Sequence, residues 1–136
     1  MRALEGLKIL LVEEEILIAM DVEQLCYEHG AVAVATISSE AKLTPEALDS
    51  IEARAAVMGA DAAILDVRVG AGSTSELARR LKKQGIPFVF ATGYTAAEPF
   101  FAEFPDVAVV AKPYASEELT RAVAAAVASV RSGDRG

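Results

Sequence analysis

The sequence has little sulfur chemistry and little concentrated positive charge. Cys26 is the only cysteine, so no internal disulfide can form, which fits a reducing compartment. Because Cys26 lies in an apolar helical stripe, we expect a small buried hydrophobe rather than a reactive thiol. The net charge is −7, and no basic cluster is longer than Arg79-Arg80 or Lys82-Lys83. Nucleic-acid binding needs a positive stripe, so the sequence argues against it and favours protein partners or small cationic ligands.

Long apolar runs are also missing. The run Leu7–Val12 is stopped at once by three glutamates, which leaves it too short for a secretory signal or a membrane span. The later apolar runs are interrupted well short of a span. We therefore expect a soluble, cytoplasmic protein that binds neither membrane nor nucleic acid.

The chain instead has the composition of one well-filled domain. Its 136 residues are 53% hydrophobic, enough to bury a full core without a disulfide or a metal. We predict one domain over residues 1–131 and a flexible tail over 132–136. Short apolar runs alternate with amphipathic segments, which predicts an α/β fold of five βα units whose strands are buried on both faces of a parallel sheet. The runs are Leu7–Val12, Ala31–Ile37, Ala62–Leu65, Phe88–Ala91 and Val107–Ala111.

The segments between the runs carry helix signals of different strength. Thr44 and Pro45 suit the N-cap and the first position of a helix in TPEALDSIEARAAVMG. The segment 94–104 contains Pro99, so we expect a short or irregular helix there. Apolar residues at helical spacing are Ile18, Val22 and Leu25 in the first segment, Leu77 and Leu81 in the third, and Leu119, Val123 and Val127 in the last, which runs from about 116 to 130.

Polar side chains follow four of the five apolar runs. Glu13 and Glu14 follow the first, Asp66 the third, Thr92 the fourth and Lys112 the fifth. In an open parallel sheet, ligands bind at the carboxyl ends of the strands. These residues are therefore the candidate functional site.

Each of these groups suits phosphoryl transfer. The Asp66 carboxylate can attack phosphorus and form an acyl phosphate. Together with the acidic residues after the first run it can hold Mg²⁺, a hard cation that prefers oxygen ligands, and the metal offsets the charge of the phosphoryl oxygens. Lys112 offers a compact positive charge to the same oxygens, and the Thr92 hydroxyl can donate a hydrogen bond to one of them.

Four motifs on this pattern resemble those of a known family. VEEE, LDV, FATGY and AKPY follow the first, third, fourth and fifth runs, and in this order they resemble the receiver domains of two-component response regulators, the CheY-like proteins. The resemblance covers about Leu7 to Val130. It implies a flavodoxin-like (βα)5 fold, with a five-stranded parallel sheet in the order 2-1-3-4-5 and helices on both faces. FATGY also resembles a narrower group, the FATGUY receivers of alphaproteobacteria.

The resemblance implies a signalling protein rather than an ordinary enzyme, although one that promotes its own magnesium-dependent phosphorylation and dephosphorylation. The phosphodonor would be a sensor histidine kinase or a histidine phosphotransfer protein. A downstream protein would bind the face formed by 94–104, 107–111 and 116–130. The implied site comprises Asp66 as phosphoacceptor with Thr92 and Lys112, and a Mg²⁺ site of Glu13, Glu14, Asp66 and the backbone carbonyl of Arg68.

Three residues depart from the usual receiver pattern. Glu14 stands where aspartate is usual, and its longer side chain moves the carboxylate relative to a metal that is strict about octahedral geometry. Gly70 replaces a proline four residues after Asp66, so we expect a more flexible loop. Val109 stands where most receivers carry an aromatic switch residue, so the signal would leave by another route.

Other interpretations of the same residues stay open. The three glutamates could be a solvated first helical turn, an interpretation we favour for Glu15 alone. A flavodoxin shares the fold, but glutamates after the first run would repel its phosphate. A degenerate receiver that is never phosphorylated is kept open by Glu14 and Gly70.

Two further features have structural alternatives. The cluster Phe100, Phe101 and Phe104 fits a core or an exposed partner surface equally well. His29 is the only histidine and ends the first predicted helix, where we expect a surface or capping residue rather than a phosphohistidine or a metal ligand.

Overall fold

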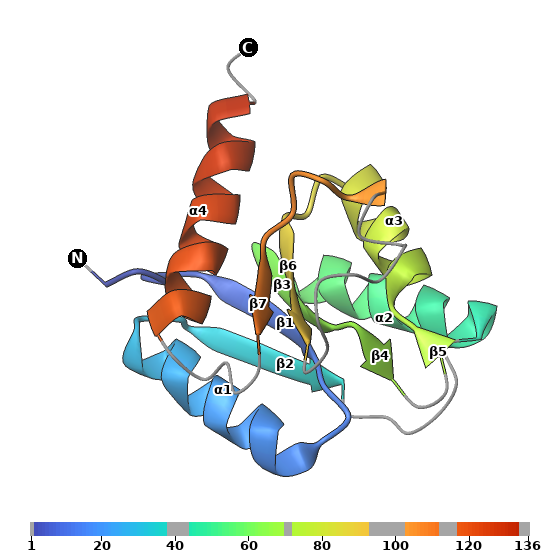
Figure 1. Ribbon diagram of the computed structural model, residues 1–136, viewed down its shortest axis with the longest axis horizontal. Coiled ribbons are helices and arrows are strands. Elements are labelled where there is room, and N and C mark those ends of the chain that lie inside the picture. Colours follow the sequence, from blue (N-terminus) through green and yellow to red (C-terminus); the bar gives the residue numbers. More distant parts are fainter. Residues whose placement is uncertain (1, 38–43, 70–71, 93–102, 112–116, 134–136) are drawn as a thin grey trace.

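A five-stranded parallel sheet flanked by helices dominates the fold (Figure 1). The computed structural model describes residues 2–37, 44–69, 72–92, 103–111 and 117–133. The strands of the sheet are β1 (Lys8–Val12), β2 (Ala33–Ile37), β3 (Ala62–Asp66), β6 (Phe88–Thr92) and β7 (Val109–Ala111), and two short strands are β4 (Arg68–Val69) and β5 (Gly72–Ser73). The helices are α1 (Ile16–Glu28), α2 (Pro45–Met58), α3 (Ser75–Lys83) and α4 (Glu117–Gly133).

The strand order confirms the predicted topology. The sheet runs β2-β1-β3-β6-β7, with every neighbouring pair parallel, which is the order 2-1-3-4-5. Two strands continue one residue past the apolar runs in the sequence, β3 to Asp66 and β6 to Thr92. Both predicted site residues therefore end a strand at the carboxyl edge of the sheet.

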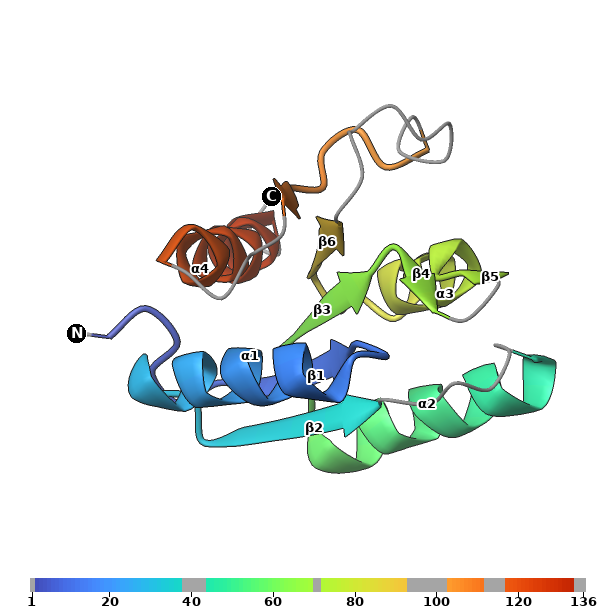
Figure 2. The same cartoon turned by 60° about the horizontal axis from the view of Figure 1, so that its bottom comes forward.

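Two hydrophobic cores lie on opposite faces of this sheet. Side chains alternate along each strand, so Ile9 and Leu11 enter one core while Leu10 and Val12 enter the other. Residues of α1 and α4 close the first core and residues of α2 and α3 close the second (Figure 2). Burial on both faces is confirmed for β1 and β3 but is wrong for β2, which is half-buried along its length because it forms an edge of the sheet.

The start and end of α2 confirm the local sequence signals. The Thr44 side chain accepts a hydrogen bond of 3.2 Å from the backbone N–H of Ala47, and Pro45 is the first helical residue. Gly59 ends the helix with φ of 70°, a left-handed conformation that glycine adopts without steric cost. Thr44, Pro45 and Gly59 therefore set the two ends of α2 through local interactions alone.

The buried faces of α1 and α4 agree with the predicted apolar faces in part or in full. The buried face of α1 is Ala19, Val22 and Cys26, and the line of contact with the sheet therefore runs along these residues. Ile18 and Leu25 lie at its partly buried margin. His29 is the C-cap residue of α1, as predicted. Leu119, Val123 and Val127 are buried in α4, as predicted.

The last helix is longer than the sequence indicated. Its predicted end was Val130, but α4 continues to Gly133, so residues 132 and 133 are helical rather than part of the expected tail. Residues 134–136 lie outside the described part of the chain. The added residues are Arg131, Ser132 and Gly133, and nothing in their local sequence predicts that the helix continues through them.

Phe104 belongs to the core. It is 4% exposed, and its ring meets those of Phe88 and Phe90 edge-to-face at 5.8 and 5.6 Å between centroids. The structure thus decides between the two interpretations for Phe104. Phe100 and Phe101 lie outside the described residues, as does most of the segment predicted to form an irregular helix.

The buried thiol of α1 gives a chemical prediction. Burial, with a smaller contribution from Glu23, raises the pKa of Cys26 to about 12. Because the thiolate is the nucleophile, we expect the folded protein to resist alkylation by iodoacetamide near pH 8, and the urea-unfolded protein to react readily. Intact mass before and after unfolding measures this. Equal labelling rates in the folded and unfolded protein would contradict it.

Candidate functional site

Strand register brings predicted site residues into one row. Val12 pairs with Leu65, so Glu13 follows β1 at the level at which Asp66 ends β3. Asp66 pairs with Ala91, the residue before Thr92. Neighbouring strands lie about 4.8 Å apart, so the ends of β1, β3 and β6 present these residues side by side.

Glu13 is a fully buried carboxylate, 0% exposed. Its Oε2 atom accepts a hydrogen bond of 3.0 Å from the backbone N–H of Glu15, and its own N–H donates to the carbonyl of Ile37 at 3.1 Å. Because Glu13 has no exposed surface and α1 begins only at Ile16, the interpretation as a solvated first helical turn is wrong for Glu13. Glu14 is half-buried, and Glu15 is exposed at the N-cap of α1, where that interpretation fits.

Asp66 ends the central strand and is only 7% exposed. The ladder with β6 continues just past it, because the N–H of Val67 donates to the carbonyl of Ala91 at 3.1 Å. The carbonyl of Asp66 accepts a hydrogen bond of 2.7 Å from the hydroxyl of Thr74, which is fully buried. Sequence reasoning missed Thr74, since a threonine before a helix predicts an N-cap rather than a contact with a strand.

The chain after Asp66 forms a small antiparallel hairpin. Arg68 pairs with Ser73 and Val69 with Gly72, which makes β4 and β5. The sequence predicted only a loop here, so this hairpin is a correction. Two-residue strands carry no periodicity that a sequence pattern can reveal. Gly70, on which the prediction of flexibility rested, lies outside the described residues.

The other predicted site residues are described only in part. The backbone of Thr92 ends β6 and that of Arg68 begins β4. Lys112 lies outside the described residues, so its role stays a prediction. Val109, at the position where receivers usually have an aromatic residue, is partly buried in β7 against the core of α2 and α3.

The acidic residues fit a metal held by few protein ligands. Among the described residues, no three His, Cys, Asp or Glu side chains gather into a group that could hold a metal ion. Mg²⁺ does not need such a group, because it keeps several waters and is usually bound through one or two carboxylates. Buried Glu13 and nearly buried Asp66 at adjacent strand ends supply hard oxygen donors of this kind.

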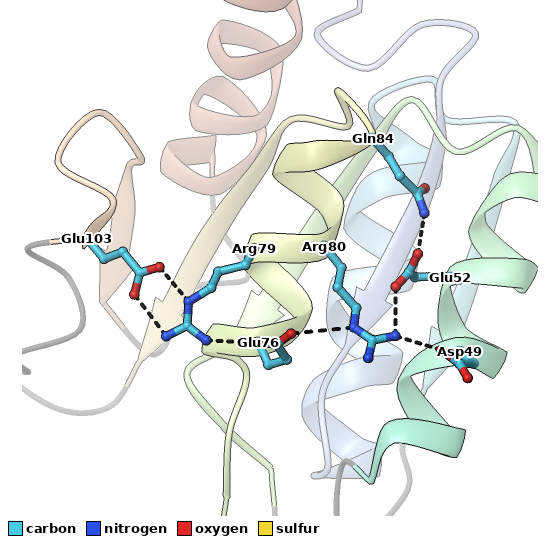
Figure 3. A network of polar contacts seen from close by, with 7 residues as sticks. All are labelled: Asp49, Glu52, Glu76, Arg79, Arg80, Gln84 and Glu103. Atoms are coloured by element: carbon cyan, nitrogen blue, oxygen red, sulfur yellow. Dashed lines mark hydrogen bonds and ion pairs between the residues drawn. The ribbon is translucent and has the colours of Figure 1, made fainter.

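A second polar cluster joins α3 to its neighbours (Figure 3). Arg80 contacts Asp49 at 2.8 Å and Glu52 at 2.9 Å, both on α2. Arg79 makes two hydrogen bonds to Glu103, of 2.5 and 3.0 Å, and its guanidinium holds the pKa of that carboxyl below its usual range. Pairs this accessible to solvent stabilise a fold only slightly, because water screens the charges. The cluster therefore aligns α3 rather than forming a reactive site.

Comparisons with known proteins show which solved structures share this fold. No protein-family model matches the chain, and no curated protein does. Among solved structures, it is similar to a response regulator receiver protein from Sinorhizobium medicae WSM419, with 25% identity, a TM-score of 0.74, and coverage of 93% of this chain and 98% of that one. A signal receiver domain of a modulated diguanylate cyclase from Desulfovibrio desulfuricans G20 has 24% identity and a TM-score of 0.75, with the same coverage of 93% and 98%.

A more distant likeness has the same architecture. A CheY-like receiver domain protein from Methanospirillum hungatei JF-1 is 17% identical, with a TM-score of 0.70 over 95% of this chain and 99% of that one. The chain has the fold of a response-regulator receiver domain. A receiver fold is generally a signalling module rather than an ordinary enzyme, and receiver domains generally bind Mg²⁺ and take kinases or phosphotransfer proteins as partners.

Neither the receiver subgroup nor a membrane location is shown by the described residues. The narrower likeness to FATGUY receivers stays a prediction, because part of FATGY lies outside the described residues. Of the helices in the described ranges, none combines the length and the apolar character that crossing a membrane requires.

Proposed function

We propose that this chain is a cytoplasmic phosphorelay receiver that accepts a phosphoryl group on Asp66 and then changes its protein contacts. The observation that carries the proposal is a nearly buried aspartate at the end of the central strand, level with the fully buried Glu13. A functional reason to keep two carboxylates buried at neighbouring strand ends is that they bind a cation or take part in a reaction. Phosphoryl transfer to one of them supplies that reason.

The transfer would run from a phosphohistidine of the donor protein. A carboxylate oxygen of Asp66 attacks phosphorus while the phosphorus–nitrogen bond breaks, and the electron pair of that bond stays on the imidazole, which takes up a proton. The product is an acyl phosphate on Asp66 and a neutral histidine on the donor. By the resemblance, Thr92 and Lys112 bind the new phosphoryl oxygens.

The metal-binding residues would be Glu13, Glu14 and Asp66, with the backbone carbonyl of Arg68, and the metal would have to draw the three carboxylates together, because they do not form a ready-made cluster in the described part of the chain. Mg²⁺ bound there would offset the negative charge of the phosphoryl oxygens. Glu14, half-buried beside Glu13, is the residue whose extra methylene we expect to weaken that binding relative to aspartate.

Exposed apolar side chains beside this edge support a protein as phosphodonor. Ile16, Leu17 and Met20 open α1 directly after the glutamates and are 64%, 74% and 56% exposed. Large apolar side chains grouped on a surface mark contact sites for other proteins. A sensor histidine kinase or a histidine phosphotransfer protein bound there would lie next to Asp66.

The downstream partner would bind the face formed by 94–104, β7 and α4. A cavity of about 460 Å³ lies on this side, with walls that are largely apolar. Phe104, Val107 and Ala108 line it from one side and Ala122 and Ala126 of α4 from the other. A cavity of this size and character supports docking of an apolar side chain from a partner.

One observation favours a second candidate, a degenerate receiver that binds partners without phosphorylation. One oxygen of Glu13 is already engaged by the N–H of Glu15, and Glu14 replaces the usual aspartate. The bond at Glu13 leaves one carboxylate oxygen less available to a metal, and the longer side chain of Glu14 places its carboxylate differently from that of the usual aspartate. The two candidates differ in whether Asp66 reacts at all.

A phosphodonor assay tests the proposal directly. The purified protein is incubated with acetyl phosphate and Mg²⁺, and intact mass should gain one phosphoryl group. Beryllofluoride with Mg²⁺ should shift backbone NMR signals at Asp66 and Thr92. If a well-behaved receiver responds in parallel and this protein gives neither adduct nor shift, the proposal falls and the degenerate receiver takes its place.

A further inference from the structure

Thr74 stands at the start of α3, yet its side chain does not serve that helix. An N-cap threonine normally accepts a hydrogen bond from a backbone N–H two or three residues later. Thr74 makes no such side-chain bond to the described residues of α3. Its hydroxyl donates instead to the carbonyl of Asp66 at 2.7 Å, with a longer contact of 3.4 Å to the carbonyl of Val67.

The backbone of Thr74 reinforces the same connection. Its N–H donates to the carbonyl of Val67 at 3.0 Å, and its carbonyl accepts from the N–H of Ala78 in the first turn of α3. Thr74 itself is 0% exposed. One buried residue therefore joins the end of the phosphoacceptor strand to the start of α3 and closes the hairpin between them.

The hydroxyl acts where β3 loses its pairing with β1, while β6 still pairs with Asp66 on the other side. The ladder between β1 and β3 ends at the pair Val12 and Leu65, one residue before Asp66. The Thr74 hydroxyl fixes the peptide plane that carries the Asp66 carbonyl. Since that plane and the carboxylate diverge from the same Cα atom, fixing one restricts the direction of the other.

We propose that Thr74 is a positioning residue for phosphoryl transfer, whose buried hydroxyl holds the carbonyl of Asp66 and so aims its carboxylate at the donor phosphorus. The inference rests on the proposed function and adds a residue to it. The same bond orients the peptide that leads to Arg68, whose carbonyl is the predicted metal ligand. A departure from local helix preference at a site residue is typical of functional constraint.

The test is Thr74→Val, which keeps the shape and removes the donor. We expect the initial rate of phosphorylation by acetyl phosphate, at saturating Mg²⁺, to fall about ten- to hundredfold, since small misplacements of reacting groups cost factors of this size. Thr74→Ser, which restores a hydroxyl, should return the rate close to that of the wild type. Without Mg²⁺, the backbone NMR signals of Asp66 and Val67 should move in the valine variant and stay close to the wild type in the serine variant.

Thr120→Val is the matched control. Thr120 is 1% exposed and its hydroxyl likewise donates to a backbone carbonyl, that of Glu117 at 3.0 Å, but it belongs to α4. We expect this variant to lose thermal stability without slowing phosphorylation. If Thr74→Val does not fold, Thr74→Cys replaces it, and its weak S–H donor predicts an intermediate rate.

The outcomes separate the two proposals. A reactive wild type with an equally fast Thr74→Val, or Thr74→Cys, overturns the role of Thr74 and leaves the proposed function standing. Equal slowing in the Thr74 and Thr120 variants also overturns it, because the effect would then be general destabilisation. A wild type that forms no adduct overturns the proposed function, and the role of Thr74 with it.

Discussion

Asp66→Asn is expected to abolish the phosphoryl adduct while the protein stays folded. The amide has nearly the shape of the carboxylate but is not a nucleophile that forms an acyl phosphate. It also removes a nearly buried negative charge next to the fully buried Glu13, which relieves repulsion between like charges. Intact mass after incubation with acetyl phosphate and Mg²⁺ should show no gain, and thermal unfolding should remain cooperative.

The matched control is Asp21→Asn on the exposed surface of α1. It makes the same chemical change and the same change in net charge, so we expect a full adduct. An adduct that persists in Asp66→Asn would show that another residue accepts the phosphoryl group. Peptide mapping of the phosphorylated protein would then locate that residue.

Leu11→Ala is expected to lower the free energy of unfolding by about 2–5 kcal/mol, which is a large part of the stability of a domain of this size. Leu11 is 0% exposed in β1 and belongs to the core closed by α1 and α4. Truncation removes buried apolar surface and leaves a cavity that packed neighbours fill only in part. Urea denaturation followed by circular dichroism measures the change, provided that the slope with denaturant stays constant.

Leu17→Ala is the control for this substitution. Leu17 is 74% exposed on α1, so the same truncation should change the free energy of unfolding by only about 0.5 kcal/mol. Equal losses in the two variants would mean that the buried core of β1 does not hold the fold as described. Because both variants make the same leucine-to-alanine change, a difference between them measures the effect of burial.

The positions of two candidate site residues in the fold could be predicted, because a strand end decides them. Asp66 and Thr92 follow apolar runs, and any parallel sheet places such residues at its carboxyl edge. Asp66 is a convincing candidate only together with the polar residues at the three other strand ends, which are Glu13 and Glu14, Thr92, and Lys112. The structure distinguishes these glutamates, because Glu13 is completely buried and Glu15 is exposed. Three consecutive glutamates in a sequence give no sign of this difference.

The sequence by itself determined the elements whose causes are local. Thr44, Pro45 and Gly59 fix the two ends of α2, because a cap, a preset φ and a left-handed turn depend only on neighbouring residues. The apolar runs determined which strands exist, and their alternation with helices restricted the sheet to few orders. These signals act over a few residues, so they can be read without the fold.

Only the tertiary structure decided the contacts between distant segments. The bonds from Arg79 to Glu103 join residues that no local pattern relates, and the half-burial of β2 depends on its place at the sheet edge. Thr74 has the local features of a helix cap, but its hydroxyl donates to the carbonyl of Asp66 because folding brings that buried carbonyl within 2.7 Å. A buried carbonyl needs a donor, and this requirement arises only once the chain has folded around it.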